Sequence, residues 1–258
     1  MDALRATPED LVLEIGPGQG ALTRVLLDAG LRVEAIEVDS ELVRQLEETW
    51  PPASSGLRVH HQDVLEADLR QWGPVMVAGN LPYYITSPIL RSLFAMGSSM
   101  RTGVLLMQRE VAERLVAKPG TRDYGFLSAL TQWHSRPELL FRVPPGAFHI
   151  PPKVDSAVVR LTPAPSLLVQ QTHAAQFESF LGWCFAQKRK TLRNNLRAYV
   201  NPEVLASLRE GPLRAEQLSV PEFATLFEHL WEQGAWKNEI FGQASRAIPS
   251  HTNGSTED

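Results

Sequence analysis

The sequence predicts an α/β protein in which a mainly parallel sheet is followed by a small all-helical region. Short apolar runs alternate with segments of helical periodicity through about the first 160 residues. Beyond the proline-rich segment Thr162-Pro163-Ala164-Pro165-Ser166, apolar residues recur only at helical spacing. We therefore expect one domain over residues 1–163, a helical domain over 164–242 and a disordered tail over 243–258.

Five parallel strands are expected, because each is a short apolar run bounded by turn residues. Their predicted ranges are Leu11–Ile15, Arg32–Glu37, Leu57–His61, Val75–Ala78 and Gly103–Met107. Two further runs, Pro137–Val143 and Ser156–Leu161, flank a proline-rich loop. Their spacing is typical of an antiparallel pair, which we expect at one edge of the sheet.

Helices are predicted between the parallel strands from apolar spacing and terminal residues. The first begins at Gln19 and is stopped by Gly30. Ser40 is expected to cap the second, and Ser87-Pro88 to begin another that runs through Phe94. A helix through Val116 follows the fifth strand.

Composition and charge exclude several classes of protein. The 258 residues are 43% hydrophobic and carry a net charge of −4, so any contact with nucleic acid must come from a local basic patch. The single cysteine, Cys184, excludes a disulfide framework and lies on an apolar helical stripe, where we expect a core residue. No apolar run approaches the ~20 residues of a membrane span. We expect a cytoplasmic monomer without membrane or metal partners.

A glycine-rich loop follows the first predicted strand and precedes a helix. Glycines at such a turn allow a ligand to approach the backbone closely. Gly16 and Gly18, with Ala21, fit a dinucleotide-binding fingerprint. Equally, the spacing of Glu14, Gly16, Gly18 and Gly20 fits the first motif of S-adenosylmethionine-dependent methyltransferases. The loop alone leaves both cofactors open.

Two acidic residues follow the next strands. Glu37 ends the second strand, where a carboxylate can accept hydrogen bonds from two ribose hydroxyls of either cofactor. Asp63 follows the third strand and, in the methyltransferase interpretation, accepts from the adenine amine.

The fourth strand leads into Asn80-Leu81-Pro82-Tyr83, which suits methyl transfer to an adenine amine. The amine is a poor nucleophile because its lone pair is delocalised into the ring. A side-chain carbonyl and a backbone carbonyl that both accept its hydrogens can hold the lone pair toward a sulfonium methyl. Pro82 restricts Leu81 to an extended conformation, and Tyr83 can stack on the base.

Three motifs in order resemble one family. They are Asn80-Leu81-Pro82-Tyr83, the segment from Val143-Pro144-Pro145-Gly146-Ala147-Phe148 to Lys153-Val154-Asp155-Ser156, and Gln187-Lys188-Arg189-Lys190-Thr191-Leu192-Arg193-Asn194-Asn195-Leu196. From about Leu11 to about Leu230, the chain resembles the bacterial small-subunit ribosomal RNA adenine dimethyltransferases, the kasugamycin-sensitivity enzymes.

This resemblance implies a Rossmann-like methyltransferase domain with a helical C-terminal domain. It implies that two methyl groups are placed on each of two adjacent adenines near the 3′ end of small-subunit RNA, in the immature subunit. The implied cofactor is S-adenosylmethionine, which leaves as S-adenosylhomocysteine, held by Gly16, Glu37, Asp63, Val64 and Asn80. Phe148 resembles the aromatic residue that sandwiches the flipped base opposite Tyr83.

One departure concerns the N-terminus. The family carries an upstream Gly-Gln-Asn-Phe-Leu-like segment that closes over the cofactor, and Met1–Asp10 contains no such motif. A start assigned too far downstream, a truncated chain or an impaired activity would each account for this. We expect the chain as written to bind the cofactor more weakly than a version extended with that segment.

Basic residues are concentrated after Cys184. Lys188, Arg189, Lys190, Arg193 and Arg197 lie within ten residues. On one helix, the three arginines would be four residues apart and line one face, where like charges are best explained by facing phosphates. Lys153 could add a phosphate contact beside Phe148.

Three alternatives remain at this point. The first is a macrolide-resistance dimethyltransferase acting on large-subunit RNA, whose relatives usually show Asn-Ile-Pro-Tyr. The second is a ribosome-assembly or RNA-binding factor that retains the fold without catalysis. The third, and the least favoured, is a nicotinamide dehydrogenase, in which Asn80-Leu81-Pro82-Tyr83 would have no function.

Overall fold

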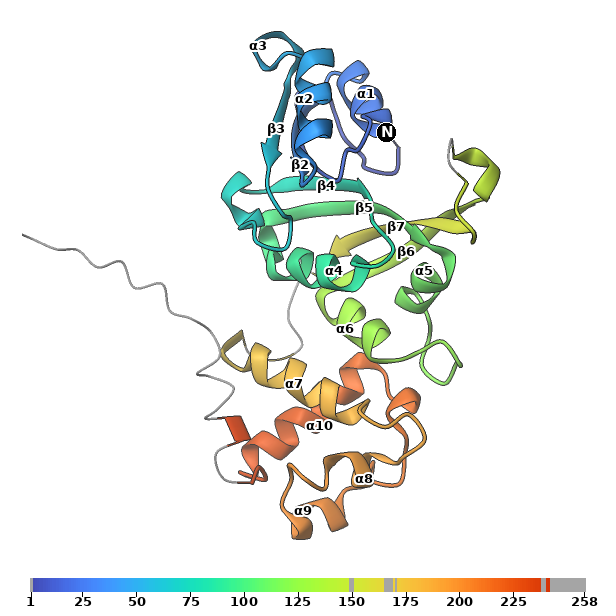
Figure 1. The fold of residues 1–258 in the computed structure, drawn as a ribbon. Coiled ribbons are helices and arrows are strands. Elements are labelled where there is room, and N and C mark those ends of the chain that lie inside the picture. Colours follow the sequence, from blue (N-terminus) through green and yellow to red (C-terminus); the bar gives the residue numbers. More distant parts are fainter. Residues whose placement is uncertain (1, 149–150, 165–168, 170, 238–239, 242–258) are drawn as a thin grey trace, which may run out of the picture. The chain divides into compact units, whose positions relative to one another are not determined.

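The computed structural model describes residues 2–148, 151–164, 169, 171–237 and 240–241 (Figure 1). The chain divides into two compact units, of which the first comprises Met1–Lys118 with Thr131–Ser166 and the second Pro119–Leu130 with Leu167–Asp258. The segment 119–130, which we had placed in the first domain by sequence order, thus groups with the second unit. The predicted tail, 243–258, lies outside the described residues.

The first unit contains a seven-stranded sheet in the order β3-β2-β1-β4-β5-β7-β6. The parallel strands are β1 (Leu11–Ile15), β2 (Arg32–Glu37), β3 (Leu57–His61), β4 (Val75–Asn80) and β5 (Met100–Gln108). The antiparallel edge consists of β7 (Ser156–Pro163) and β6 (Ser135–Val143). Both the parallel sheet and its antiparallel edge confirm the predicted class.

The order of strands reverses at β1, which pairs with β2 on one side and β4 on the other. Open α/β sheets bind ligands at the carboxyl ends of the strands beside such a switch point. The glycine loop after β1 and Asn80 at the end of β4 both lie at this edge.

The core explains why these strands are continuous apolar runs. Val12, Val33 and Met76 of the sheet form one buried cluster with Leu26 of α1 (Ala21–Asp28) and Leu46 of α2 (Ser40–Thr49). A strand covered by helices has little exposed surface on which polar residues would be favoured.

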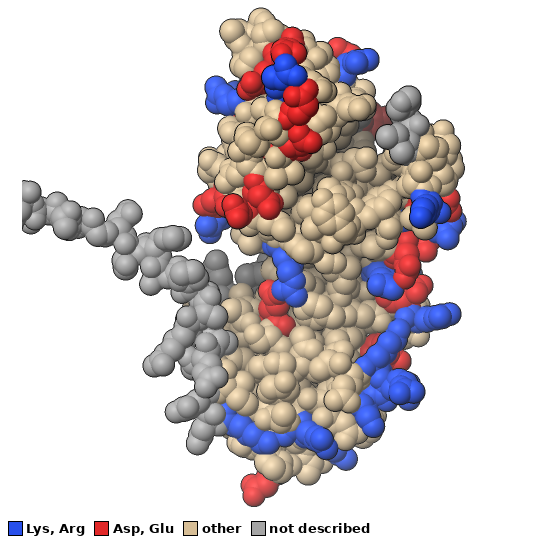
Figure 2. All heavy atoms as spheres, in the orientation of Figure 1, with Lys and Arg blue, Asp and Glu red and all other residues tan. Residues whose placement is uncertain are grey.

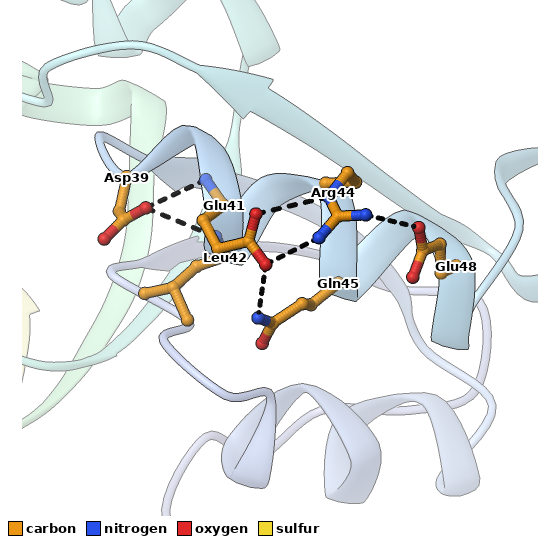
Figure 3. A network of polar contacts seen from close by, with 6 residues as sticks. All are labelled: Asp39, Glu41, Leu42, Arg44, Gln45 and Glu48. Atoms are coloured by element: carbon orange, nitrogen blue, oxygen red, sulfur yellow. Dashed lines mark hydrogen bonds and ion pairs between the residues drawn. The ribbon is translucent and has the colours of Figure 1, made fainter.

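Three helix starts differ from the prediction. Helix α1 begins at Ala21, after Gly20, and not at Gln19. The cap of α2 is Asp39 and not Ser40: Asp39 Oδ1 accepts from the backbone amides of Glu41 at 2.9 Å and Leu42 at 3.4 Å (Figure 3). A negatively charged carboxylate at the N-terminus of a helix is also stabilised by the helix dipole. Helix α4 (Thr86–Ala95) begins before Ser87, and the Thr86 hydroxyl donates to the Pro82 carbonyl at 3.1 Å.

The remaining helices of the sheet region are short. They are α3 (Pro52–Ser55), α5 (Arg109–Leu115) and α6 (Phe126–His134). The sequence analysis did not predict α6, and the division between the two units falls within it.

The second unit is helical, with α7 (Ala174–Cys184), α8 (Leu192–Leu196), α9 (Pro202–Ser207) and α10 (Val220–Glu232). Its core is aromatic: the ring of Phe227 lies 5.4 Å from that of Phe177 and 5.5 Å from that of Phe180. Cys184 is fully buried, as predicted, and burial raises the pKa of its thiol. Among the described residues, no helix is long and apolar enough to cross a membrane.

Candidate active site

The glycine loop between β1 and α1 needs glycine for two different reasons. Gly16, Gly18 and Gly20 all have positive φ angles, of 64°, 57° and 79°. A Cβ atom on Gly16 or Gly18 would meet no atom within 4 Å, so a side chain there would extend into open space beside the loop. A Cβ on Gly20 would lie 2.5 Å from the Trp50 ring. The first two glycines therefore leave a cradle for a ligand, whereas the third permits packing.

Glu37 ties the end of β2 to this loop. Its side chain is largely buried, and its Oε2 accepts from the amide of Gly18 at 3.1 Å. Oε1 accepts from the amides of Val38 at 2.9 Å and Asp39 at 3.0 Å. Three backbone donors compensate for burying the carboxylate. Oε1 already accepts two of them, so the remaining lone-pair capacity for a hydroxyl donor is on Oε2. This arrangement fits the predicted contact with a ribose.

Glu14 lies under the loop. The residue is only 1% exposed, and its carboxylate accepts from the Thr23 hydroxyl on α1 at 2.7 Å. Burial raises the pKa of Glu14 to about 7, partly offset by the bond from Thr23. The predicted contact of Glu14 with the cofactor stays a prediction. In the structure, the hydrogen bond from Thr23 to the Glu14 carboxylate joins β1 to α1.

Asp63 lies in the loop after β3. One of its oxygens accepts from the Leu65 amide at 2.9 Å, and the neighbouring Val64 is buried. The amide of Gln62 donates to the Glu37 carbonyl at 3.0 Å, so this loop starts beside the end of β2. The free oxygen of Asp63 can still accept from an adenine amine.

Asn80 is the last residue of β4. Its neighbour Gly79 pairs with Ile15, the last residue of β1, and a Cβ on Gly79 would lie 2.7 Å from the Ile15 carbonyl oxygen. The exposed Asn80 and the glycine loop therefore follow two paired parallel strands at the same edge of the sheet. Glycine at position 79 is thus a requirement of this juxtaposition.

The turn after Asn80 is held at several points. The amide of buried Leu81 donates to the Leu106 carbonyl at 2.9 Å, and that of Ile85 donates to the Pro82 carbonyl at 3.2 Å. The Tyr83 hydroxyl lies 2.6 Å from the hydroxyl of Ser156, the first residue of β7. The sequence analysis used Ser156 as a strand residue and as the last residue of the second motif, without a contact to Tyr83. Nothing local to its own sequence indicates a contact with a loop 73 residues earlier.

The second motif lies in the first unit. Phe148 follows the short turn Pro145–Ala147 and is partly buried, whereas Lys153 is exposed. His149 and Ile150 between them lie outside the described residues. Just beyond, Asp155 pairs with Arg109 at 2.8 Å and Ser156 contacts Tyr83, which anchors the end of this segment to the sheet.

The basic run does not form the single helical face that we expected. Helix α7 ends at Cys184 and α8 begins at Leu192, so Arg189 lies in the connecting turns and only Arg193 in a helix. The break is fixed by Thr191, whose hydroxyl caps α8 by accepting from the Asn194 amide, and by Asn195, which donates to the Cys184 carbonyl.

The basic residues are nevertheless at the surface. Lys188, Arg189, Lys190, Arg193 and Arg197 are all exposed. The Lys188 side chain donates to the Arg122 carbonyl, and that of Arg193 donates to the Ala206 carbonyl. On the face shown in Figure 2, Lys and Arg side chains gather along the right and lower rim of the second unit, with few Asp or Glu among them. The local basic patch is therefore present, presented by a turn and a short helix.

The described residues hold no cluster of three or more His, Cys, Asp or Glu that could bind a metal ion. His60, to which the sequence analysis gave no role, contacts the Glu34 carboxylate at 2.5 Å on the sheet.

Taken together, the switch point, the open cradle at Gly16 and Gly18, and the carboxylates at the ends of β2 and β3 form the cofactor site of a Rossmann-like fold. The model for the ribosomal RNA adenine dimethylase family matches residues 1–232, and the chain belongs to this family, which makes it an S-adenosylmethionine-dependent methyltransferase.

Named relatives agree with this assignment. Ribosomal RNA small subunit methyltransferase A of Pseudomonas syringae pv. syringae is 42% identical over 236 residues, covering 90% of this chain and 88% of the relative. The protein of the same name from Thiobacillus denitrificans is 41% identical over 232 residues, covering 89% and 90%.

Two solved structures are similar over most of their length. A dimethyladenosine transferase from Plasmodium falciparum has a TM-score of 0.77 at 25% identity, covering 91% of this chain and 94% of that chain. The 23S rRNA methyltransferase ErmE has a TM-score of 0.66 at 28% identity, covering 89% and 94%.

Proposed function

We propose that this protein places two methyl groups on each of two adjacent adenines near the 3′ end of small-subunit ribosomal RNA. We propose that it acts as a cytoplasmic monomer on the immature subunit. The observation that carries the proposal is the position of Asn80 at the end of β4, because β4 pairs with β1 and the glycine loop leaves the same edge of the sheet.

The chain's own residues act by positioning. When bound, S-adenosylmethionine supplies an electrophilic methyl group on sulfur. The Asn80 side-chain carbonyl and the Leu81 backbone carbonyl accept the amine hydrogens, which directs the nitrogen lone pair out of conjugation. Holding the reacting atoms in line supplies much of the acceleration.

The target base must leave its stack, which costs a few kcal/mol. Stacking on Tyr83 and Phe148 would offset this cost, at roughly 1–3 kcal/mol per aromatic contact. The bond between the Tyr83 and Ser156 hydroxyls supports this role, since it restricts the tyrosine ring before the base arrives.

A general base is not required by this scheme. Glu14, whose pKa is raised toward neutrality, is committed to Thr23 and only 1% exposed. The proton leaves after methyl transfer, when the substituted amine is far more acidic. The exposed basic residues from Lys188 to Arg197, with Lys153, contact phosphates of the RNA.

The test is transfer of tritiated methyl groups to small subunits from a strain lacking this methylation, with large subunits in parallel. We expect label in small-subunit RNA, recovered as dimethyladenosine by mass spectrometry. Label in large subunits would favour the activity for which ErmE is named. Binding to subunits without transfer to either would show a non-catalytic factor.

A further inference from the structure

Tyr84 is an aromatic residue of the active-site turn that the proposed mechanism does not use. It is 86% exposed, by far the most exposed large hydrophobic residue among those described; the next, Val38, is 65% exposed. It lies four residues after Asn80 and directly after Tyr83. An isolated exposed aromatic residue is common on protein surfaces, so its exposure alone assigns no role.

The backbone that carries Tyr84 is fixed. Tyr83 and Tyr84 are the central residues of a turn closed by the bond from the Ile85 amide to the Pro82 carbonyl. The Thr86 hydroxyl donates to the same carbonyl at 3.1 Å. The turn is anchored before it by Leu81 on β5 and at Tyr83 by Ser156 on β7. A ring on this turn is therefore presented at a defined position.

The two neighbouring tyrosines have opposite environments. The hydroxyl of Tyr83 is paired with Ser156, and its ring is partly buried, whereas Tyr84 presents nearly all of its surface to solvent. Exposing a large ring on a rigid turn gains no packing energy. The same ring gains free energy when a flat ligand covers it. Every nucleobase offers such a face, and single-stranded RNA is bound largely by base stacking on exposed aromatic residues.

We propose that Tyr84 is a stacking surface for the nucleotide next to the adenine being methylated. This inference rests on the proposed function, in which the substrate has two adjacent adenines. The base in the site is held at Asn80 and Tyr83, while its chain neighbour stacks on Tyr84 and is thereby separated from it. Tyr84 thus positions the substrate strand and takes no part in methyl transfer.

The test is a double-mutant cycle between the protein and its RNA. One component is Tyr84→Ala, and the other is an RNA oligonucleotide with an abasic nucleotide next to the target adenine. On intact RNA containing two adjacent adenines, we expect Tyr84→Ala to weaken binding by about 5-fold to 150-fold. On abasic RNA, we expect the wild type and Tyr84→Ala to bind equally, because the ring then has no base to cover.

Three controls separate stacking from other roles. Tyr84→Phe keeps the ring and should bind intact RNA like the wild type. Phe141→Ala removes another exposed aromatic residue, on β6, and should leave RNA binding unchanged. The cofactor dissociation constant and the melting temperature of Tyr84→Ala should equal those of the wild type.

Two results would overturn the inference: unchanged binding of intact RNA by Tyr84→Ala, or an equal loss on intact and abasic RNA. Transfer by the wild type to small subunits is measured alongside. Failure of that transfer would reject the proposed function, whereas wild-type transfer with no effect of Tyr84→Ala would reject only the stacking role.

Discussion

The carboxylate of Glu37 accepts a hydrogen bond from the backbone amide of Gly18 across 3.1 Å, which joins the end of β2 to the middle of the glycine loop. The loop is thereby shaped before a cofactor binds. Because Gly18 has a positive φ angle, and no side chain of its own to hold it, this bond is its link to the second strand.

Glu37→Gln should weaken cofactor binding by about 10-fold to 100-fold. The amide removes the charge, and its NH2 group cannot accept, so one or two of the three backbone donors that the carboxylate satisfies lose their acceptor. Calorimetric titration with S-adenosylhomocysteine measures the effect. The matched control is Glu34→Gln on the same strand, whose partners are Arg58 and His60; equal dissociation constants for both variants would contradict the prediction.

Asn80→Ala should lower turnover on the order of 100-fold or more while leaving the fold intact. It removes an acceptor that orients the amine, and Asn80 is exposed, so little packing is lost. Asp63→Ala should instead act mainly by weakening cofactor binding. Single-turnover rates and cofactor titrations distinguish the two variants. Near-wild-type turnover in Asn80→Ala would show that Asn80 does not orient the lone pair of the amine.

Changing both Arg189 and Arg193 to Glu should abolish binding to small subunits with little effect on cofactor affinity. Both side chains are exposed in the second unit, whereas the glycine loop belongs to the first. For the wild type, log affinity should fall by roughly 0.7 to 0.9 per log unit of salt for each phosphate neutralised. Arg70→Glu, an exposed reversal in the first unit, is the control. A salt-independent affinity would argue that the run is merely a solvated surface.

The buried carboxyl of Glu14 should make the protein less stable as pH rises. Its pKa of about 7 in the folded state exceeds its ordinary 4.5, so the folded protein holds a proton that the unfolded chain has released. This contribution is complete below pH 4.5 and lost as pH rises through about 7, a change of roughly 3 kcal/mol. Glu14→Gln should therefore gain stability relative to the wild type across this window. Urea unfolding of the wild type and Glu14→Gln at pH 5 and pH 8 tests the prediction. The same difference in unfolding free energy between the two proteins at both pH values would refute it.

The buried side chain of His134 should make the protein less stable as pH falls, which is opposite to the effect of Glu14. Burial lowers its pKa from 6.5 to about 4, helped by the charge of Arg91, and its ring stacks on Phe94 with centroids 5.0 Å apart. Its neutral form stabilises the fold above pH 6.5, and this stability is lost as pH falls through about 4, again by roughly 3 kcal/mol. His134→Gln should flatten the acid side of the stability profile. Between pH 4.5 and 6.5, Glu14 and His134 change the free energy of unfolding with pH in opposite directions. The free energy of unfolding of the wild type should therefore vary less over this range than that of either variant.

The parallel strands could be predicted because burial on both faces leaves each as a distinct apolar run, such as Leu11–Ile15. Helix starts were less accurate: Asp39 and Ser40 are both good caps, and only the geometry after β2 selects Asp39. The positions of Gly16, Glu37 and Asn80 at one sheet edge follow from parallel topology.

Contacts across long sequence separations could not be predicted. The bond between Tyr83 and Ser156 depends on the antiparallel register of β7 on β5, which no local pattern contains. The expected single helical face of the basic run was wrong because spacing of four residues suits a helix, whereas α7 ends at Cys184, before the run, and α8 starts inside it after the Thr191 cap.

The assignment of residues 119–130 to the second unit has a consequence for recombination. The chain passes between the two units at three points, near 118, 130 and 166. Tyr124 of this segment is 1% exposed, and its ring lies 6.1 Å from that of Phe185. A gene fusion that exchanges everything after residue 166 between two homologues would pair a foreign helical unit with the original 119–130. Functional chimaeras should therefore require both pieces to be inherited together, and natural breakpoints should avoid separating them.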